Sequence, residues 1–231
     1  MADPADTGFP PVIFDCDGVL VDSEPISIRV LLDMFAKWGV VVEEMAAYRR
    51  FLGLSMASIA GIVRVEFGFE ITPWHLDQVR IRLHDRFRTE LLPIPGIGET
   101  LDLIGPKRCV ASSSQPERIR LSLGVTGLLE RLEPHIYSST MVENGKPAPD
   151  LFLHAARAMN VPAAACVVVE DSPAGIEAAR RAGMHVLAFV GGSHARACGL
   201  RDAVDALSPD AVFDDMRALP GLLGRFGPRV A

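Results

Sequence analysis

The sequence predicts an α/β protein: a doubly wound, Rossmann-like parallel sheet with a small all-helical domain inserted after the first strand. Short apolar runs alternate with helical patterns, which is typical of βαβ units. Runs such as Cys166–Val169 and Val186–Val190 are continuously apolar, as expected for strands that helices cover on both faces. The alternation stops for about 70 residues after the first strand, a stretch too long for a simple crossover.

The strands expected in the sheet are short. They are Val12–Phe14, Arg108–Ala111, a weaker stretch near Ile136, Cys166–Val169, Val186–Val190 and Ala211–Phe213. Helix signals follow several of them. Ser114 and Glu117 have the spacing of a capping box, and Ser172 precedes a proline suited to the first helical position. Gly183 fits the C-terminal cap of that helix, and another helix is expected from Pro149 to Met159.

The inserted segment contains apolar residues at helical spacing. The stripes comprise Ile26, Val30, Met34 and Trp38 up to Gly39, then Ile59, Ile62 and Val63, then Leu76, Val79, Leu83 and Phe87 after a start at Thr72–Pro73. We therefore assign residues 1–22 and 94–231 to an α/β catalytic core and residues 23–93 to a helical cap domain.

The composition is that of an ordinary globular protein, with 49% hydrophobic and 23% charged residues in a chain of 231. A net charge of −6 and the lack of a basic stripe argue against a nucleic-acid partner. No apolar run is long enough to span a membrane, and Met1–Pro10 does not resemble a signal peptide, so we expect no membrane partner and a cytoplasmic location. Four widely spaced cysteines, Cys16, Cys109, Cys166 and Cys198, are expected to be free thiols. The oligomeric state is left open.

Two carboxylates follow the first strand directly. Asp15 and Asp17 are two residues apart, so in an extended chain their side chains point to the same side. Without a cation they would repel each other, and a divalent metal resolves that conflict. Gly18 permits a close turn beside them. The alternative is that Asp17-Gly18 is an ordinary hairpin turn between two apolar runs.

Three later stretches place further polar residues at strand ends. Ser112 to Ser114 end one strand before a helix, where hydroxyls and free amides suit a phosphate. Lys146 lies in a proline-rich loop, and Glu170 and Asp171 end a buried strand. Taken singly, simple N-capping or a solvated lysine explains each stretch. Together they belong at the carboxyl edge of an open α/β sheet, where ligands bind.

In this order and spacing, the four stretches resemble the four motifs of haloacid-dehalogenase-like phosphatases. The insert resembles the cap of their beta-phosphoglucomutase-like subfamily, and the resemblance extends from Val12 to Leu219. It implies a Mg²⁺-dependent phosphatase that hydrolyses a small phosphorylated metabolite, a sugar phosphate or a phosphoglycolate-like acid, through an aspartyl-phosphate. The resemblance implies that Asp15 is the nucleophile and that Asp17 is the general acid and base. It implies that Ser112 and Ser113 bind the phosphate and that Lys146 stabilises its charge. The implied Mg²⁺ ligands are Asp15, Asp171, the Asp17 carbonyl and, directly or through water, Glu170.

The substrate-facing part of the insert is expected in a loop over residues 49–56. Its candidate substrate contacts are Arg49, Arg50 and Gly53. Beta-phosphoglucomutases resemble this loop but place a lysine and an arginine where this chain has Leu52 and Met56, and they also carry a histidine shortly after the first motif.

Hydrolysis is therefore preferred, with the mutase reaction as the alternative. A dehalogenase is disfavoured because it has no use for Asp17. A non-catalytic phospho-ligand-binding protein on the same fold is the alternative of another class. Among the histidines, His194 follows a strand and is interpreted as an exposed loop residue, with a place at the rim of the site as the alternative.

Overall fold

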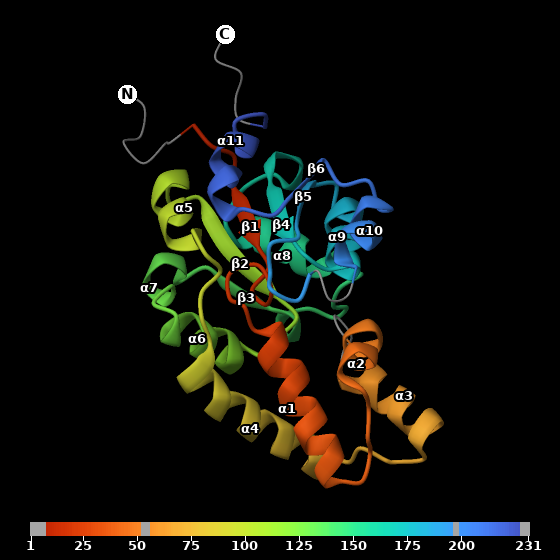
Figure 1. Cartoon of the computed structure of the whole chain (residues 1–231). Coiled ribbons are helices and arrows are strands. Elements are labelled where there is room, and N and C mark those ends of the chain that lie inside the picture. The colour runs from red at the N-terminus through yellow and green to blue at the C-terminus, as the bar shows by residue number, and fades with distance from the viewer. Residues whose placement is uncertain (1–7, 52–55, 196–198, 227–231) are drawn as a thin grey trace.

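A six-stranded parallel sheet forms the centre of the protein, which a computed structural model describes over residues 8–51, 56–195 and 199–226. The strands are β1 (Val12–Phe14), β2 (Arg108–Ser112), β3 (Ile136–Ser138), β4 (Val167–Glu170), β5 (His185–Phe189) and β6 (Ala211–Phe213). Their order across the sheet is β3-β2-β1-β4-β5-β6, with β1 between β2 and β4 (Figure 1). The strand order thus reverses beside β1, which is the switch point where open α/β sheets bind ligands.

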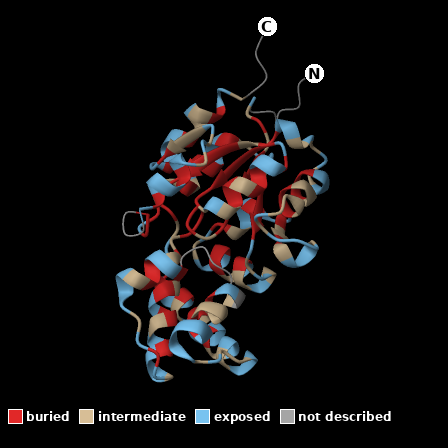
Figure 2. Cartoon of the chain, turned by 90° about the vertical axis from the view of Figure 1, so that its right-hand side faces the viewer, coloured by how far each residue is buried: buried red, intermediate tan, exposed pale blue. Residues whose placement is uncertain are grey.

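Both faces of the sheet are covered. Val12 and Phe14 face one apolar cluster, and Ile13 between them faces the other. The first cluster includes residues of α5 (Ile97–Ile104), α6 (Pro116–Val125), α7 (Leu129–Leu132) and α11 (Leu219–Leu223). The second includes residues of α8 (Asp150–Ala158), α9 (Pro173–Arg181) and α10 (Leu200–Asp205). The buried strands lie at the centre of this double layer (Figure 2), which confirms the predicted fold class.

The expected strands are all present, and where bounds were predicted no end moves by more than one residue. Glu170, expected just beyond its strand, is the last residue of β4 and pairs in register with Ala188 of β5. Three short 3₁₀ turns complete the core, at Ser139–Met141, Ala163–Ala165 and Met216–Ala218. Cys16, Cys109 and Cys166 are buried free thiols as predicted, and Cys198 lies outside the described residues.

The insert folds into helices beyond the carboxyl end of the strands (Figure 1). They are α1 (Glu24–Lys37), α2 (Glu44–Phe51), α3 (Met56–Phe67) and α4 (Pro73–Glu90). The three predicted stripes match α1, α3 and α4. Helix α2 was not predicted, because it is short and only three of its residues, Ala47, Tyr48 and Phe51, are buried. The carboxylate of Glu43 accepts hydrogen bonds from the backbone N–H groups of Met45 and Ala46 and so starts this helix.

Two adjacent segments connect the insert to the sheet. Val21 and Pro93 form an antiparallel bridge, and the backbone N–H of Asp22 donates to the carbonyl of Leu92 at 3.0 Å. The insert therefore leaves and re-enters the core at one place. None of the described helices has the length and apolar character needed to cross a membrane.

Candidate active site

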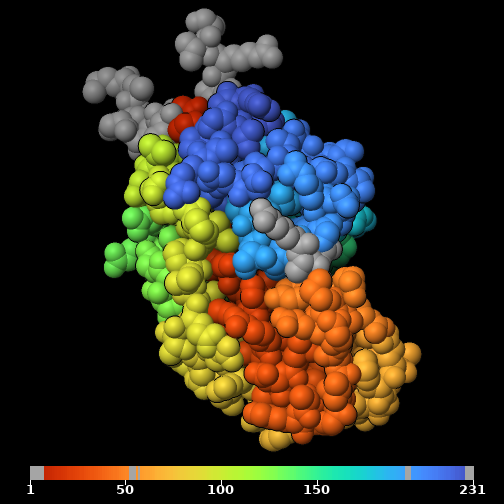
Figure 3. All heavy atoms as spheres, in the orientation of Figure 1, coloured from red at the N-terminus to blue at the C-terminus, as the bar shows by residue number. Residues whose placement is uncertain are grey.

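A cavity of about 1040 Å³ lies where the carboxyl ends of the strands face α1–α4. Its lining includes residues from all four predicted motifs: Asp15, Asp17, Ser112, Ser113, Lys146, Glu170 and Asp171. The rest of the wall comes from α1–α4, from the first turn of α6, from the start of α9, from α10 and from the loop after β5. In Figure 3 the orange-to-yellow surface of the insert lies directly against the surface of the core. The convergence expected from the sequence is therefore present.

Lys146 joins the first and last motifs. Its ammonium nitrogen lies 2.5 Å from Asp15 Oδ1 and 2.6 Å from Glu170 Oε1, and its side chain is 4% exposed. Burial alone would lower the pKa of Lys146, but the two carboxylates raise it, so the amine is a buried cation. Burial raises the pKa of Asp15 well above its usual value, against the opposing charge of Lys146. Lys146 is thus a fixed positive charge beside the candidate nucleophile.

The Glu170 carboxylate is fully engaged. Oε1 accepts from Lys146, and Oε2 accepts from the backbone N–H and the hydroxyl of Ser172, at 2.7 and 2.9 Å. The hydroxyl of Ser172 in turn caps α9 by accepting from Gly175 N–H, as its sequence position predicts. A Cβ on Gly175 would lie 1.7 Å from Glu170 Oε1, so glycine is required there. With both oxygens occupied, Glu170 is better placed to hold Lys146 than to bind a metal directly.

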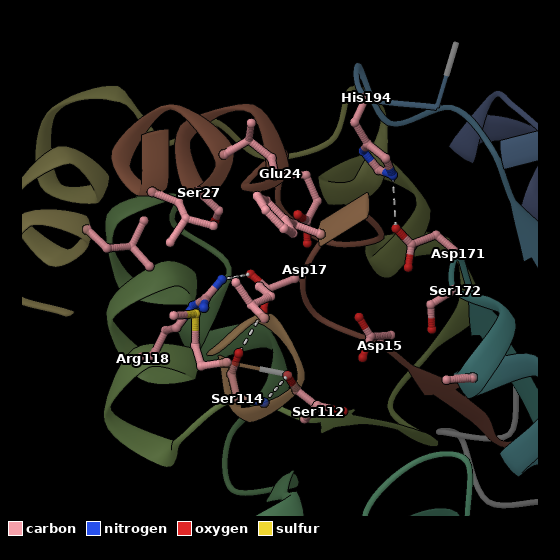
Figure 4. A pocket seen from close by; sticks show the side chains of 18 of the residues that line it. Asp15, Asp17, Glu24, Ser27, Ser112, Ser114, Arg118, Asp171, Ser172 and His194 are labelled. Carbon is pink, nitrogen blue, oxygen red and sulfur yellow. Dashed lines mark hydrogen bonds and ion pairs between the residues drawn. The ribbon is translucent and has the colours of Figure 1, made fainter. Parts of the chain in front are cut away.

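Asp171 is packed between a glycine turn and a histidine. Gly18 has φ of +78°, and a Cβ there would lie 1.9 Å from Asp171 Oδ2. His194 Nε2 lies 3.3 Å from the same oxygen (Figure 4). His194 is 2% exposed, so the expectation of an exposed loop histidine is wrong. The loop after β5 turns inward because Gly192 leaves room for the ring: a Cβ on Gly192 would lie 2.7 Å from His194 Cε1.

Three donors hold the Asp17 carboxylate, and Figure 4 shows two of them, Arg118 and Ser114. Its Oδ1 accepts from the hydroxyl of Ser23 at 2.6 Å and from Arg118 Nη2 at 2.9 Å. Its Oδ2 accepts from the hydroxyl of Ser114 at 2.8 Å. Burial would raise the pKa of Asp17, but the Arg118 charge and these hydrogen bonds outweigh burial and lower it. Asp17 is therefore an ionised carboxylate in this arrangement.

The serine motif follows β2. Ser112 is buried, and its Oγ accepts from the backbone N–H of Ser114, while Ser113 also lines the cavity. The predicted capping box of Ser114 and Glu117 is wrong. The residue before α6 is Gln115, no side chain caps the helix, and the Ser114 hydroxyl donates to Asp17 instead. A capping serine would accept from a backbone N–H, but the Ser114 hydroxyl is directed at Asp17 and donates to its carboxylate in a charge-assisted hydrogen bond.

The residues suit a hard divalent cation bound through few protein ligands. Burial is the main cause that raises the pKa of Asp171, and the charge of Glu170 raises it further. The charge of Asp171 also contributes to the raised pKa of Asp15. Two buried carboxylates that disfavour each other's charge are stabilised by a cation between them. No ready-made group of three or more His, Cys, Asp or Glu side chains that could hold a metal occurs among the described residues. The oxygen donors fit Mg²⁺, which keeps several waters and binds through one or two carboxylates plus a substrate phosphate.

The candidate substrate contacts on the insert differ in their placement. Arg49 lies on α2, not in a loop, and lines the cavity. Arg50 lies on the same helix but pairs with Glu66 of α3, and it is absent from the described lining. Gly53 and Leu52 lie outside the described residues. Met56 lines the cavity with an apolar side chain where the mutase resemblance places a cation.

Comparison with known proteins agrees with this geometry. Residues 12–189 match the family model described as haloacid dehalogenase-like hydrolase. The chain belongs to the haloacid dehalogenase-like hydrolase family. It is 35% identical over 184 residues to 6-phosphogluconate phosphatase of Escherichia coli K12, covering 79% of this chain and 83% of that protein. It is 33% identical over 184 residues to a phosphorylated carbohydrates phosphatase of Thermotoga maritima, covering 75% and 81%.

Solved structures of this hydrolase family superpose on the whole fold. A conserved haloacid dehalogenase-like protein from Agrobacterium tumefaciens has a TM-score of 0.80 at 35% identity, covering 94% of this chain and 98% of that one. A family hydrolase from Deinococcus radiodurans, with bound phosphate and sodium, has a TM-score of 0.73 at 29% identity, covering 96% and 100%. The predicted family and the prediction of an enzyme are thus confirmed.

Sequence reasoning missed two residues of this hydrolase's cavity. Arg118 is in the first turn of α6 and contacts Asp17. Glu24 begins α1, and burial, followed by the charges of Asp17 and Asp171, raises its pKa to about 7. Both are polar residues at the start of a helix, where solvent exposure is the ordinary expectation. Only the meeting of the insert with the core buries them.

Proposed function

We propose that the chain is a Mg²⁺-dependent phosphomonoesterase that transfers the phosphoryl group of a small phosphorylated sugar or sugar acid to Asp15. The observation that carries this proposal is the buried Asp15–Lys146 contact of 2.5 Å, with Asp171 beside it and the serine motif facing the same cavity. A carboxylate approaches an anionic phosphate only where cations offset the repulsion. Two of the relatives are named as phosphatases of phosphorylated sugars or sugar acids.

The first chemical step is in-line attack by an Asp15 oxygen on phosphorus. The bond from phosphorus to the leaving oxygen breaks, its electron pair stays on that oxygen, and Asp17 donates a proton to it. The product is an acyl phosphate on Asp15. Lys146 offsets the negative charge that gathers on the phosphoryl oxygens, and the Ser112 hydroxyl and Ser113 amide bind them.

The second step uses the same residues in reverse. Asp17, now a carboxylate, removes a proton from water as the water oxygen attacks phosphorus, and the bond to Asp15 breaks. The lowered pKa of Asp17, held down against burial by Arg118 and two serine hydroxyls, suits this base role. For the acid role of the first step, the bound leaving group must displace one of those donors so that Asp17 carries a proton. Inorganic phosphate then leaves and Asp15 is restored.

Magnesium would be held by Asp15, Asp171 and the Asp17 carbonyl, with Glu170 in support through Lys146 or water. When bound, the ion supplies positive charge opposite a phosphoryl oxygen. Residues 23–93 would act as the cap that closes over the substrate and excludes water. Arg49 is a cap cation available to a substrate hydroxyl or carboxylate, and Arg80 of α4 also lines the cavity.

Simple hydrolysis is preferred to the mutase reaction. A mutase must hold a doubly phosphorylated intermediate in two orientations and needs cationic contacts on the cap to do so. Met56, at one of the two positions concerned, is apolar and faces the cavity.

The test is Mg²⁺-dependent phosphate release from a panel of phosphorylated sugars and sugar acids. Asp15→Asn is expected to remove activity, while Asp202→Asn, an exposed acid on α10, is expected to keep it. An inactive wild type across the panel, activity in Asp15→Asn, or interconversion of hexose phosphates with a bisphosphate primer would each contradict the proposal.

A further inference from the structure

Arg118 occupies the junction between the candidate acid and the insert. It lies in the first turn of α6, where its Nη2 donates to Asp17 Oδ1 at 2.9 Å. Its guanidinium carbon lies 5.3 Å from the centroid of the Phe87 ring, which belongs to α4. Its side chain is only 25% exposed, and it lines the same cavity as Asp15. One residue of the core thus touches the Asp17 carboxylate and the cap helix together.

The Asp17 carboxylate has three donors, and they differ in stiffness. Ser23 and Ser114 donate through hydroxyls, which rotate freely and can turn to other acceptors. Arg118 donates through a planar guanidinium that lies over the Phe87 ring, a contact that restricts its rotation. Arg118 also forms an ion pair with Asp17, whereas the two hydroxyls are neutral donors to the same carboxylate. Figure 4 shows the Arg118 guanidinium directed at Asp17, and of the three donors it is the one least free to turn away.

We propose that Arg118 is a positioning residue for Asp17, setting the direction from which Asp17 protonates the leaving oxygen. This inference rests on the proposed function. Arg118 itself acts through Asp17 and makes no bond to the reacting atoms. No motif contains it, because it lies on the helix after the serine motif and its contact with Asp17 spans 101 positions of the sequence.

A positioning role for Asp17 predicts a dependence on the leaving group. A sugar alkoxide is a poor leaving group and needs the proton from Asp17, whereas a dinitrophenolate leaves readily without one. The ratio kcat/KM reports only steps up to the first irreversible one, the cleavage of the ester bond, so the later hydrolysis of the acyl phosphate does not enter. A hexitol phosphate and dinitrophenyl phosphate form a matched pair, since neither has a second anionic group for Arg118 to bind.

The experiment is Arg118→Met, measured on both esters with saturating Mg²⁺. A displaced acid costs about 100-fold, and the hydroxyls of Ser23 and Ser114 still hold Asp17 in the variant, so the loss is expected to be smaller than that. The expected result is a net loss of about tenfold or more in kcat/KM for the hexitol phosphate and a change within about threefold for dinitrophenyl phosphate. Retained dinitrophenyl turnover also shows that the variant is folded. Lys146→Met is the control and is expected to lower both values.

Two further variants make the test independent of folding. Arg118→Lys keeps a cationic donor and is expected to recover part of the hexitol phosphate activity. In an Asp17→Asn background, Arg118→Met is expected to cause no further loss, because the group that it positions is gone. Equal losses on both esters, no loss on either, or a full additional loss in the Asp17→Asn background would overturn the inference. Failure of the wild type on both esters would instead contradict the proposed function.

Discussion

At the scale of single residues, Lys146 carries a positive charge that is almost completely buried in the cavity. A buried ammonium is costly unless it is paired, and here it is paired twice, with Asp15 and Glu170. Its stem also passes the Phe152 ring, whose centroid lies 5.0 Å from the nitrogen. Each carboxylate therefore depends on the same cation. The arrangement keeps a positive charge at the nucleophile before any substrate arrives.

Lys146→Ala is expected to lower kcat by about 100-fold or more, as removal of one preorganised charge stabiliser does in other enzymes. The loss follows because the phosphoryl charge and Asp15 would lose their nearest fixed cation. Steady-state kinetics on a phosphorylated sugar measures it. Lys107→Ala is the control, since Lys107 is exposed and lies outside the described lining. A Lys146 variant within twofold of the wild type would show that the ammonium plays no part in catalysis.

At the scale of elements, the approach of α9 to the end of β4 organises the last motif. Ser172 caps the helix and also donates to Glu170, and Gly175 leaves the space that the Glu170 carboxylate occupies. These contacts therefore join the start of α9 to the end of β4 and to Glu170, the partner of Lys146. A change in the helix should therefore alter the position of Lys146 through Glu170.

Gly175→Ala tests this unit. The new methyl group would lie 1.7 Å from Glu170 Oε1, and the carboxylate cannot move aside without losing Lys146 or Ser172. We expect a loss of about 1–3 kcal/mol in the free energy of unfolding, together with lower activity. Gly98→Ala in α5 is the matched control, because no atom lies within 4 Å of a Cβ there. It is expected to be neutral or to stabilise by about 0.5 kcal/mol. Denaturant titration of both variants decides, and equal stabilities would contradict the account.

At the scale of the whole molecule, the sequence was most informative about what lies at the sheet edge. Parallel strands end at one edge, so Asp15, Ser112 and Asp171 had to converge once their strands were recognised. The same periodicity located α1, α3 and α4. These predictions succeeded because they depend on local pattern and on topology alone.

The unsuccessful predictions concern contacts between distant segments. Ser114 was assigned to a helix cap, but a carboxylate from 97 positions away takes its hydroxyl. His194 was expected outside because a Gly-rich loop is normally exposed, and it turns inward only where Gly18 and Gly192 leave space. Arg118 gave no signal at all, since one arginine in an Arg-rich chain is unremarkable until Asp17 lies beside it.

The stability of the whole fold should depend jointly on Mg²⁺ and pH. Burial above all raises the pKa of Asp15 and Asp171, so the folded, metal-free protein holds protons that the unfolded chain releases above about pH 4. The contribution of these two groups to the free energy of unfolding therefore falls as pH rises through their folded-state pKa values. Mg²⁺ competes with those protons and is expected to stabilise the folded protein more at about pH 7.5 than at about pH 5.

At about 100 times its Kd the ion adds about 2.7 kcal/mol to the free energy of unfolding, which is about 5–10 °C in Tm for a chain of this size. Thermal unfolding with and without Mg²⁺ measures this difference. Asp171→Asn is expected to remove it and Asp202→Asn to keep it, and a Tm shift that is the same at both pH values would contradict the assignment of Asp15 and Asp171 as magnesium ligands.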